Sequence, residues 1–525
     1  MSAGQIDRYI HENLPPPELW PEILALPDVP QSGRLNCADF LLDKHATSDA
    51  ADRLAVIGEH FSWTYAELNV QSNRIANVMQ HQFGIISGNR VLIRAPNEPM
   101  AVAIWLAVQK LGAIAVTTVP LLRRSEITEI IEIAKVSLVV CETTYTDAIS
   151  EAECQVVEYG NDTCALESLT SEASDWFEGY QTNADDIALI GFTSGTTGKP
   201  KATIHFHRDV LSICKVLCDE IIHPTRDDIF IGTAPLAFTF GLGGLLAFPL
   251  YAGASSVLMQ HVRPEGFLEA IASHRATICF TVPTFYQRMA RCIQLGELDS
   301  LRLAVSSGEA LPDPVRRAWL ECSGLPLAEV LGSTEMLHAF LGADSIAAER
   351  GAIGPAFPGY EVAILDDAGQ RLPANSPGRL AVKGPTGCRY LNDPRQKDYV
   401  VNGWNITGDT CSMTEDDMIM FHARKDDMII TSGYNVSGIE VENALLAHPN
   451  VAECAVIGEP DSDRGNIVSA FVVLNYRHIE SHDMVEQLQE HVKAQIAPYK
   501  YPRKLTFVRE LPRNSSGKIQ RHRLR

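Results

Sequence analysis

The chain has 525 residues, of which 46% are hydrophobic and 21% are charged, values typical of a soluble globular enzyme with roughly two to four domains. The formal net charge of −21 argues against nucleic acid or an anionic membrane as a partner. Twelve cysteines without CxxC pairs, and the absence of an N-terminal signal segment, favour free thiols in a cytoplasmic protein.

The N-terminal part alternates predicted strands and helices. Proline clusters in the first forty residues predict an irregular arm. Thr64 and Glu67 predict a capping box at the start of a helix. Apolar strands are then predicted at 90–93, 113–118, 137–140, 187–190, 228–231, 276–280 and 301–305. Because helical stretches separate them, we expect parallel sheets covered by helices.

The segment 230–260 contains no charged residue, so a hydropathy window alone would read it as a membrane span. Pro235, Pro249 and several glycines interrupt it, however. We therefore predict a buried strand, a glycine-rich loop and a buried helix, and no association with a membrane.

The pattern changes after about Gly351, where short strands separated by turns predict a barrel-like or antiparallel piece. From about Arg424 the order strand, helix, two strands, helix and strand predicts a further unit. The predicted fold is therefore α/β. A large N-terminal domain (1–425) has helix-covered parallel sheets plus a small barrel-like β subdomain, and a small mobile C-terminal α+β domain (426–525) follows.

A loop rich in hydroxyls, glycines and lysines spans 193–201, directly after a predicted strand. Its backbone N–H groups, hydroxyls and ammonium groups could face a polyphosphate. It is not a Walker A loop, because Thr193 stands where that motif needs glycine and Pro200 where it needs Ser or Thr. A mobile Ser/Thr/Gly linker is the alternative.

Further motifs follow in a fixed order, at 306–310, 331–335, 351–355, 404–409, 424–427 and 512–518. Together with 193–201 they closely resemble the adenylate-forming superfamily of acyl-CoA synthetases, luciferases and peptide-synthetase adenylation domains. The resemblance covers about 61–521. The segment 332–338 resembles the benzoate–CoA ligase branch, and the N-terminal arm resembles 2-aminobenzoate (anthranilate)–CoA ligases.

The resemblance implies ATP, Mg²⁺ and coenzyme A as cofactors. A carboxylate would attack the α-phosphorus of ATP, so positive charge must offset the repulsion between two anions. The implied contacts to the phosphates are Thr193, Ser194, Gly195, Thr196, Thr197, Gly198 and Lys199. The implied contacts to the rest of the nucleotide are Gly308, Glu309, Ala310, Gly332, Ser333, Thr334, Asp409 and Arg424. Many relatives carry an aromatic residue where Leu331 stands, so we expect no stacking on adenine there.

The resemblance also implies catalytic roles for Lys518, Glu335 and Thr193, with Glu335 holding the metal. Asp426 would be the hinge about which the C-terminal domain rotates, and Gly433 would line the tunnel for coenzyme A. Residues 497–525 contain nine Lys or Arg and one acidic residue. They form either a solvated tail or a patch that meets these polyanions.

The implied acyl pocket consists of Phe238, Tyr286, Ala304, Leu337 and His338. Its flat, aromatic character favours a small-molecule aromatic carboxylic acid, with 2-aminobenzoate first and benzoate or another substituted benzoate next. Loading of a carrier protein, luciferase-type oxidation and nucleotide binding without catalysis are the alternatives. A homodimer is a further expectation.

Overall fold

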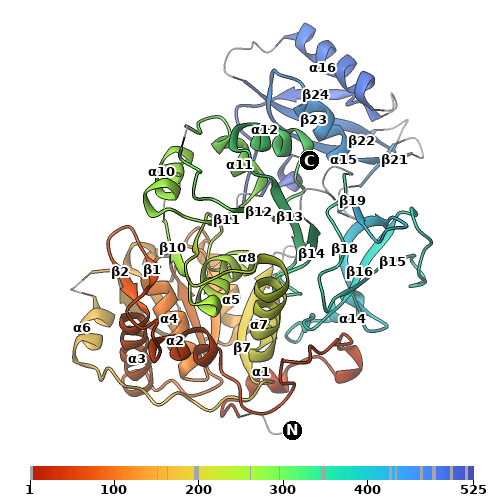
Figure 1. Cartoon of the computed structure of the whole chain (residues 1–525). Coiled ribbons are helices and arrows are strands. Elements are labelled where there is room, and N and C mark those ends of the chain that lie inside the picture. The colour runs from red at the N-terminus through yellow and green to blue at the C-terminus, as the bar shows by residue number, and fades with distance from the viewer. Residues whose placement is uncertain are drawn as a thin grey trace.

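The computed structural model describes the chain except for residues 1–3, 150–151, 162–163, 194–199, 261, 295, 344–350, 425–427, 432–433, 462–464, 476–480, 497–499, 515–517 and 525. Two helix-covered sheets are followed by a smaller antiparallel sheet and by a C-terminal unit of strands and helices (Figure 1). The predicted fold class is confirmed.

The first large sheet has six strands in the order β6-β5-β3-β4-β7-β8. The bounds are β3 (Arg90–Arg94), β4 (Ile114–Thr118), β5 (Leu138–Glu142), β6 (Gln155–Tyr159), β7 (Ile187–Thr193) and β8 (Lys201–Phe206). All neighbours are parallel except β7 and β8, which are antiparallel and pair Thr193 with Lys201. The two described residues that bound the predicted phosphate loop, Thr193 and Lys201, are therefore paired at the edge of this sheet.

The second large sheet has eight strands in the order β14-β13-β12-β11-β9-β10-β1-β2, antiparallel only at its two ends. The bounds are β1 (Leu54–Ile57), β2 (Ser62–Thr64), β9 (Ile229–Gly232), β10 (Ser255–Val257), β11 (Ile278–Thr281), β12 (Leu303–Ser306), β13 (Leu327–Gly332) and β14 (Ala339–Ala343). The confirmed alternation of strands and helices explains the parallel pairing, because a parallel strand needs a crossover connection.

The helices of this part are α1 (Tyr9–Glu12), α2 (Lys44–Ala46), α3 (Tyr65–His81), α4 (Pro99–Lys110), α5 (Arg124–Ala134), α6 (Ala165–Glu172), α7 (His207–Cys214), α10 (Pro264–His274), α11 (Pro283–Met289) and α12 (Asp313–Ser323). The expected capping box is present at α3, since the Thr64 hydroxyl accepts from the Glu67 N–H and the Glu67 carboxylate accepts from the Thr64 N–H. Helix α4 is buried on almost every side, which its nearly all-apolar sequence requires.

The uncharged segment 230–260 lies inside the protein. After β9 it forms α8 (Thr239–Leu242), η5 (Gly243–Ala247) and α9 (Phe248–Ala252), followed by β10. Most of these residues are buried in the core shared by the two large sheets. Within the described ranges, no helix combines the length and the apolar character that crossing a membrane requires.

The third sheet is antiparallel and consists of β15 (Glu361–Leu365), β16 (Gly378–Lys383), β17 (Val400–Val401), β18 (Trp404–Met413) and β19 (Ile419–Arg424). The C-terminal unit contains β20 (Met428–Thr431), β21 (Tyr434–Ser437), α15 (Gly438–Leu446), β22 (Val451–Asp461), β23 (Gly465–Leu474), α16 (His482–Gln495) and β24 (Lys504–Phe507). It has a hydrophobic core of its own. The predicted boundary at 425/426 lies outside the described residues and stays a prediction.

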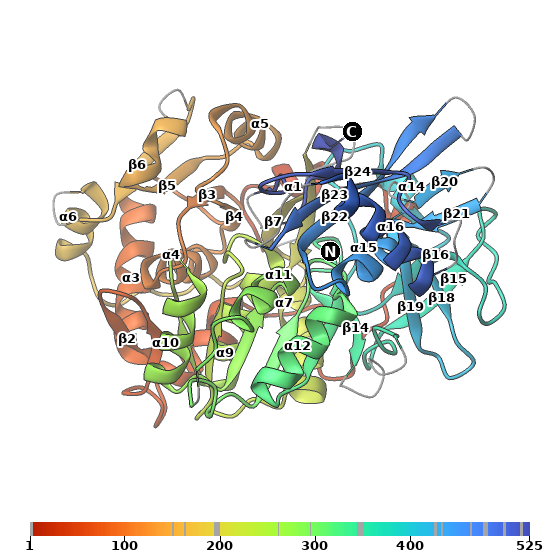
Figure 2. The ribbon, with the colours of Figure 1, turned by 90° about the horizontal axis from the view of Figure 1, so that it is seen from above.

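The C-terminal unit contacts the second large sheet through α11 and α12, and both views place α15 beside α12 (Figures 1 and 2). The Gln287 side-chain amide donates to the Ala452 carbonyl at 3.0 Å, and Arg288 pairs with Glu453 at 3.2 Å. These contacts close one side of the cavity described next.

Candidate active site

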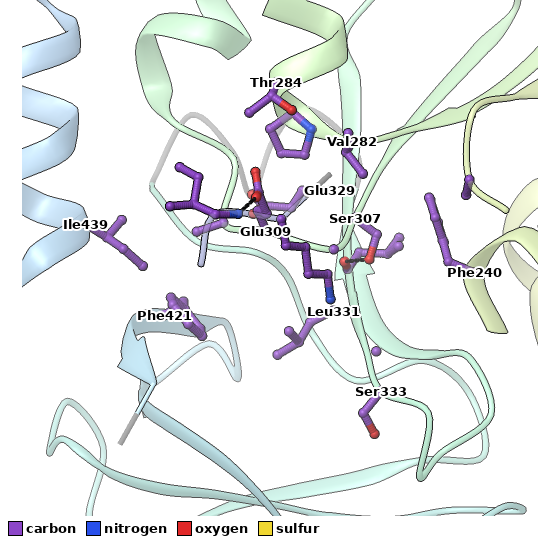
Figure 3. A pocket seen from close by; sticks show the side chains of 18 of the residues that line it. Phe240, Val282, Thr284, Ser307, Glu309, Glu329, Leu331, Ser333, Phe421 and Ile439 are labelled. Carbon is purple, nitrogen blue, oxygen red and sulfur yellow. Dashed lines mark hydrogen bonds between the residues drawn. The ribbon is translucent and has the colours of Figure 1, made fainter. Parts of the chain in front are cut away.

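A cavity of about 540 Å³ lies where the two large sheets, the antiparallel sheet and the C-terminal unit meet. Its walls come mainly from the carboxyl ends of β7, β12 and β13 and from the segments after β9 and β11, the usual place for a ligand in parallel sheets. Figure 3 shows Ile439 and Phe421 on one side of Glu309 and Leu331, with Phe240 on the other.

The polar end of the cavity begins at Thr193, the last residue of β7. Its hydroxyl oxygen is buried, and no other described residue forms a hydrogen bond with it. Such a hydroxyl is suited to a ligand oxygen, because an unpaired buried polar group is costly. Its predicted partners in the loop, 194–199, lie outside the described residues.

Glu335 lies at the same end and is 7% exposed. Its Oε1 accepts from the Tyr390 hydroxyl at 2.6 Å and lies 3.4 Å from Lys201 Nζ. Burial and the neighbouring Glu335 carboxylate raise the pKa of Tyr390, so its hydroxyl stays a donor. The described residues contain no group of three or more His, Cys, Asp or Glu that could hold a metal alone. The donor set therefore fits Mg²⁺ only as an ion that arrives with substrate phosphates.

A buried polar network, which sequence reasoning missed, supports the backbone next to Glu335. His205 Nε2 donates to the Thr334 carbonyl at 2.8 Å, and His205 Nδ1 lies 3.8 Å from Asp209. Arg389 lies 3.6 Å from the same Asp209 carboxylate, and the side chains of His205, Asp209 and Arg389 are fully buried. Although burial alone would raise the pKa of Asp209, His205 and Arg389 hold it below its ordinary value.

The expected nucleotide contacts of the strand ends line the same cavity: Gly308, Glu309, Ala310, Gly332, Ser333, Thr334 and Asp409. Gly308 has φ +93°, a conformation that favours glycine. Asp409 on β18 is paired in register with Arg424 on β19. The side chain of Arg424 lies outside the part of the chain that the structure describes.

Lys518 also lines the cavity, although it comes from the C-terminal unit. Its Cε lies 3.5 Å from the point where a Cβ on Gly308 would stand, so the lysine arm runs along this glycine. The structure thus brings Lys518, Glu335 and Thr193 to one cavity. Asp426, predicted as the hinge, and Gly433, predicted to line the tunnel for coenzyme A, lie outside the described residues.

Another part of the cavity lining is aromatic and contains Phe238, Phe240 and His338. The His338 ring centroid is 5.8 Å from that of Phe240 and 4.8 Å from that of Phe248. A Cβ on Gly243 would lie 2.4 Å from His338 Cδ2, so only glycine leaves room for this ring. Sequence reasoning did not select Phe240, Phe248 or Gly243 as pocket residues.

His338 is 3% exposed, and neither ring nitrogen has a hydrogen-bond partner of ordinary geometry among the described residues. Burial lowers its pKa to about 3, although the nearby Phe240 backbone offsets part of this effect. The imidazole is therefore neutral at pH 7. A neutral imidazole has one nitrogen lone pair that can accept a hydrogen bond.

Three other predicted wall residues lie away from this lining, in the core. Tyr286 packs on Trp319 at 4.7 Å and donates through its hydroxyl to the Cys279 and Val305 carbonyls. Ala304 belongs to the same core cluster, since neighbouring residues of β12 face opposite sides of the sheet. Leu337 is fully buried in the core shared by the two large sheets, with φ +67°. Of the five wall residues predicted from the sequence, only Phe238 and His338 are among the residues that line this cavity.

Comparison with known families shows that residues 42–390 match the AMP-binding enzyme family and residues 440–518 match the AMP-binding enzyme C-terminal domain. The benzoate–CoA ligase of Thauera aromatica is 33% identical over 98% of this chain and 98% of its own length. The 3-hydroxybenzoate–CoA ligase of Aromatoleum sp. (strain CIB) is 31% identical, covering 94% of this chain and 97% of its own. The crystal structure of the anthranilate CoA ligase AuaEII in complex with anthranoyl-AMP superposes with a TM-score of 0.89 at 30% identity, covering 95% of this chain and 97% of the other.

Proposed function

Since the chain belongs to the AMP-binding enzyme family, as its ordered motifs predicted, we propose that it is an ATP-dependent aryl-acid–CoA ligase. The observation that carries this proposal is one cavity lined both by the polar residues Thr193, Glu335 and Lys518 and by the rings of Phe240 and His338. Related ligases named for benzoate, 3-hydroxybenzoate and anthranilate support the aromatic acid as the substrate class.

In the first step, a carboxylate oxygen of the acid attacks the α-phosphorus of ATP. The new P–O bond forms as the bond to pyrophosphate breaks, which leaves an aryl-adenylate. The Lys518 ammonium is suited to this step because it can contact the carboxylate and the α-phosphate together and offset their repulsion. The Thr193 hydroxyl is suited to donate to a phosphate oxygen.

Glu335 is the residue that would hold Mg²⁺, and the ion would supply positive charge next to the phosphates. The protein's own contribution is to fix this carboxylate. Tyr390 and Lys201 contact its Oε1, while His205 holds the adjoining Thr334 carbonyl. A carboxylate held from two sides is ordered before the nucleotide arrives, which lowers the cost of binding.

In the second step, the thiol of coenzyme A attacks the carbonyl carbon of the adenylate. The C–S bond forms as the C–O bond to AMP breaks, and the thiol proton is released. On the family resemblance, we propose Asp426 as the hinge of the C-terminal domain and Gly433 as part of the tunnel for coenzyme A. Cytoplasmic location and homodimerisation also stay predictions from the sequence.

Among aromatic acids we propose 2-aminobenzoate as the preferred substrate, with benzoate or another substituted benzoate next. The neutral His338 supports this choice, because it can accept a hydrogen bond from an ortho-amino N–H. A site that pairs a buried acceptor with a substrate N–H discriminates against analogues without that group.

The test of catalysis is the variant Lys518→Ala. We expect ATP–pyrophosphate exchange to fall by a factor of about 10² to 10³, since one charge contact to a transition state is worth roughly 3–4 kcal/mol. Binding of ATP should persist. Lys504→Ala is the matched control, because Lys504 lies on β24 and is half exposed. Equal loss in both variants, or full exchange in Lys518→Ala, would contradict the proposal.

A further inference from the structure

The carboxylate of Glu309 joins the large part of the chain to the loop that carries Lys518. Glu309 Oε1 accepts a hydrogen bond from the backbone N–H of Ile519 at 3.1 Å, and Ile519 directly follows Lys518. The same oxygen lies 3.9 Å from Arg513 Nη1, at the other end of that loop. Figure 3 shows Glu309 at the cavity wall between Thr284 and Leu331. The Glu309 side chain thus contacts Arg513 and Ile519, the two ends of the segment 513–519, which we call the lysine loop.

The loop is closed at its base by its own hydrogen bonds. The Asn514 N–H donates to the Lys518 carbonyl at 2.8 Å, and the Lys518 N–H donates to Asn514 Oδ1 at 2.9 Å. The Gln520 N–H donates to the Pro512 carbonyl at 2.8 Å. Because these bonds fix the Lys518 backbone relative to its neighbours, a contact at Ile519 also fixes where the lysine side chain starts.

A second carboxylate, that of Glu453 in the C-terminal unit, also contacts the loop. Arg513 Nη2 donates to Glu453 at 2.9 Å, and Arg288 of α11 lies 3.2 Å from the same carboxylate. Arg513 is thus placed between Glu453 of its own unit and Glu309 of the large part. The side chains of Arg513 and Glu309 are 19% and 20% exposed, so water weakens their attraction less than at an open surface.

We propose that Glu309 is a positioning residue for adenylation, which holds Ile519 so that Lys518 enters the cavity. This rests on the proposed function of Lys518. The family resemblance implied that residues 308–310 contact the adenine part of the nucleotide. The structure directs the Glu309 carboxylate to the lysine loop, and the backbone of these residues still lines the cavity.

The proposal separates the two half-reactions. Adenylation needs Lys518 inside the cavity, whereas the family's second step needs it withdrawn. Loss of the Glu309 carboxylate should therefore lower ATP–pyrophosphate exchange and leave the formation of thioester from supplied aryl-adenylate and coenzyme A within about twofold. A carboxylate needed only for folding would affect both reactions.

The kinetic test combines Glu309→Ala with Lys518→Ala. We expect Glu309→Ala to lower the exchange rate about tenfold or more, and to cause no further loss in the Lys518→Ala background, since residues that act through each other are not additive. Glu309→Gln keeps an oxygen that can accept from Ile519 and should recover part of the rate. A multiplicative loss in the double variant, with a raised KM for ATP, would overturn the proposal in favour of an adenine contact.

A second test needs no substrate. Amide hydrogen exchange of a peptide that contains Ile519, in the ligand-free protein, should be faster in Glu309→Ala than in the wild type. Glu321→Ala is the control, because Glu321 is an exposed acidic residue of α12. Equal exchange in Glu309→Ala and the wild type would refute the contact. If no aromatic acid supports pyrophosphate exchange in the wild type, the proposed function fails, but this measurement still decides the contact.

Discussion

When the pH is lowered, His338 should stay neutral well below pH 6.5, where an ordinary histidine becomes protonated. Burial lowers its pKa to about 3 from an ordinary value of 6.5. At pH 5, about 1% of this imidazole should be protonated, compared with about 97% of an unperturbed one. The aromatic end of the cavity therefore keeps its hydrogen-bond acceptor across the physiological range.

The same shift makes folding stability depend on pH. The folded pKa is depressed, so between pH 6.5 and 3 the unfolded chain binds more protons and stability falls as the pH falls. From pH 7 to pH 5 the loss from His338 is about 2 kcal/mol. His207 is also buried with a pKa of about 3 and adds a similar loss, so only a comparison with a His338 variant isolates this residue.

The assay is a pH titration of protein labelled with ¹³C at histidine Cε1, with the His338 resonance assigned from its absence in His338→Asn. We expect no shift of this resonance between pH 8 and pH 5. Urea unfolding should lose less stability on acidification in His338→Asn than in the wild type. His60→Asn, at an exposed histidine, should titrate and unfold like the wild type apart from its own resonance. A His338 midpoint near pH 6.5 would refute the reasoning.

Three further changes test the contacts of the cavity. Gly243→Ala places a methyl group 2.4 Å from His338 Cδ2 and should raise the KM for aromatic acids about tenfold with the KM for ATP unchanged; an unchanged acid KM would contradict this packing. Tyr390→Phe removes the donor to Glu335 and should raise the Mg²⁺ concentration needed for pyrophosphate exchange, and an identical Mg²⁺ dependence would argue against the role of this bond. Asp209→Asn removes the negative charge from a buried cluster that contains an arginine, and should lower stability by about 3–5 kcal/mol, seen as a lower thermal midpoint; a midpoint within 1 °C or so of the wild type would contradict it.

Much of the fold could be predicted because its signals are local. Apolar strands between helical stretches indicated parallel sheets, and Thr64 with Glu67 indicated a helix start that the structure confirms. The uncharged segment 230–260 was placed inside the protein because prolines and glycines break it. The motif residues at the ends of β7, β12 and β13 meet in one cavity, as expected for parallel strands whose carboxyl ends share an edge.

The side chains that contact one another across the site could not be predicted. Tyr286 of α11 and Ala304 of β12 were predicted as walls, but the periodicity of a helix or a strand does not tell which of its faces borders the cavity. The contact of His205 with Thr334 joins residues 129 apart, and that of Glu309 with Ile519 joins residues 210 apart. No periodicity or spacing in one sequence reports such pairs.

The most direct test of the proposed function is ATP–pyrophosphate exchange over a panel of benzoate, 2-, 3- and 4-aminobenzoate, salicylate, octanoate and several amino acids, repeated with coenzyme A to detect thioester. We expect the strongest exchange with 2-aminobenzoate, and conversion of free coenzyme A into its thioester. Exchange restricted to octanoate or amino acids would contradict the aromatic pocket. Strong exchange with an aromatic acid but no thioester from free coenzyme A would contradict the ligase and favour transfer to a carrier protein.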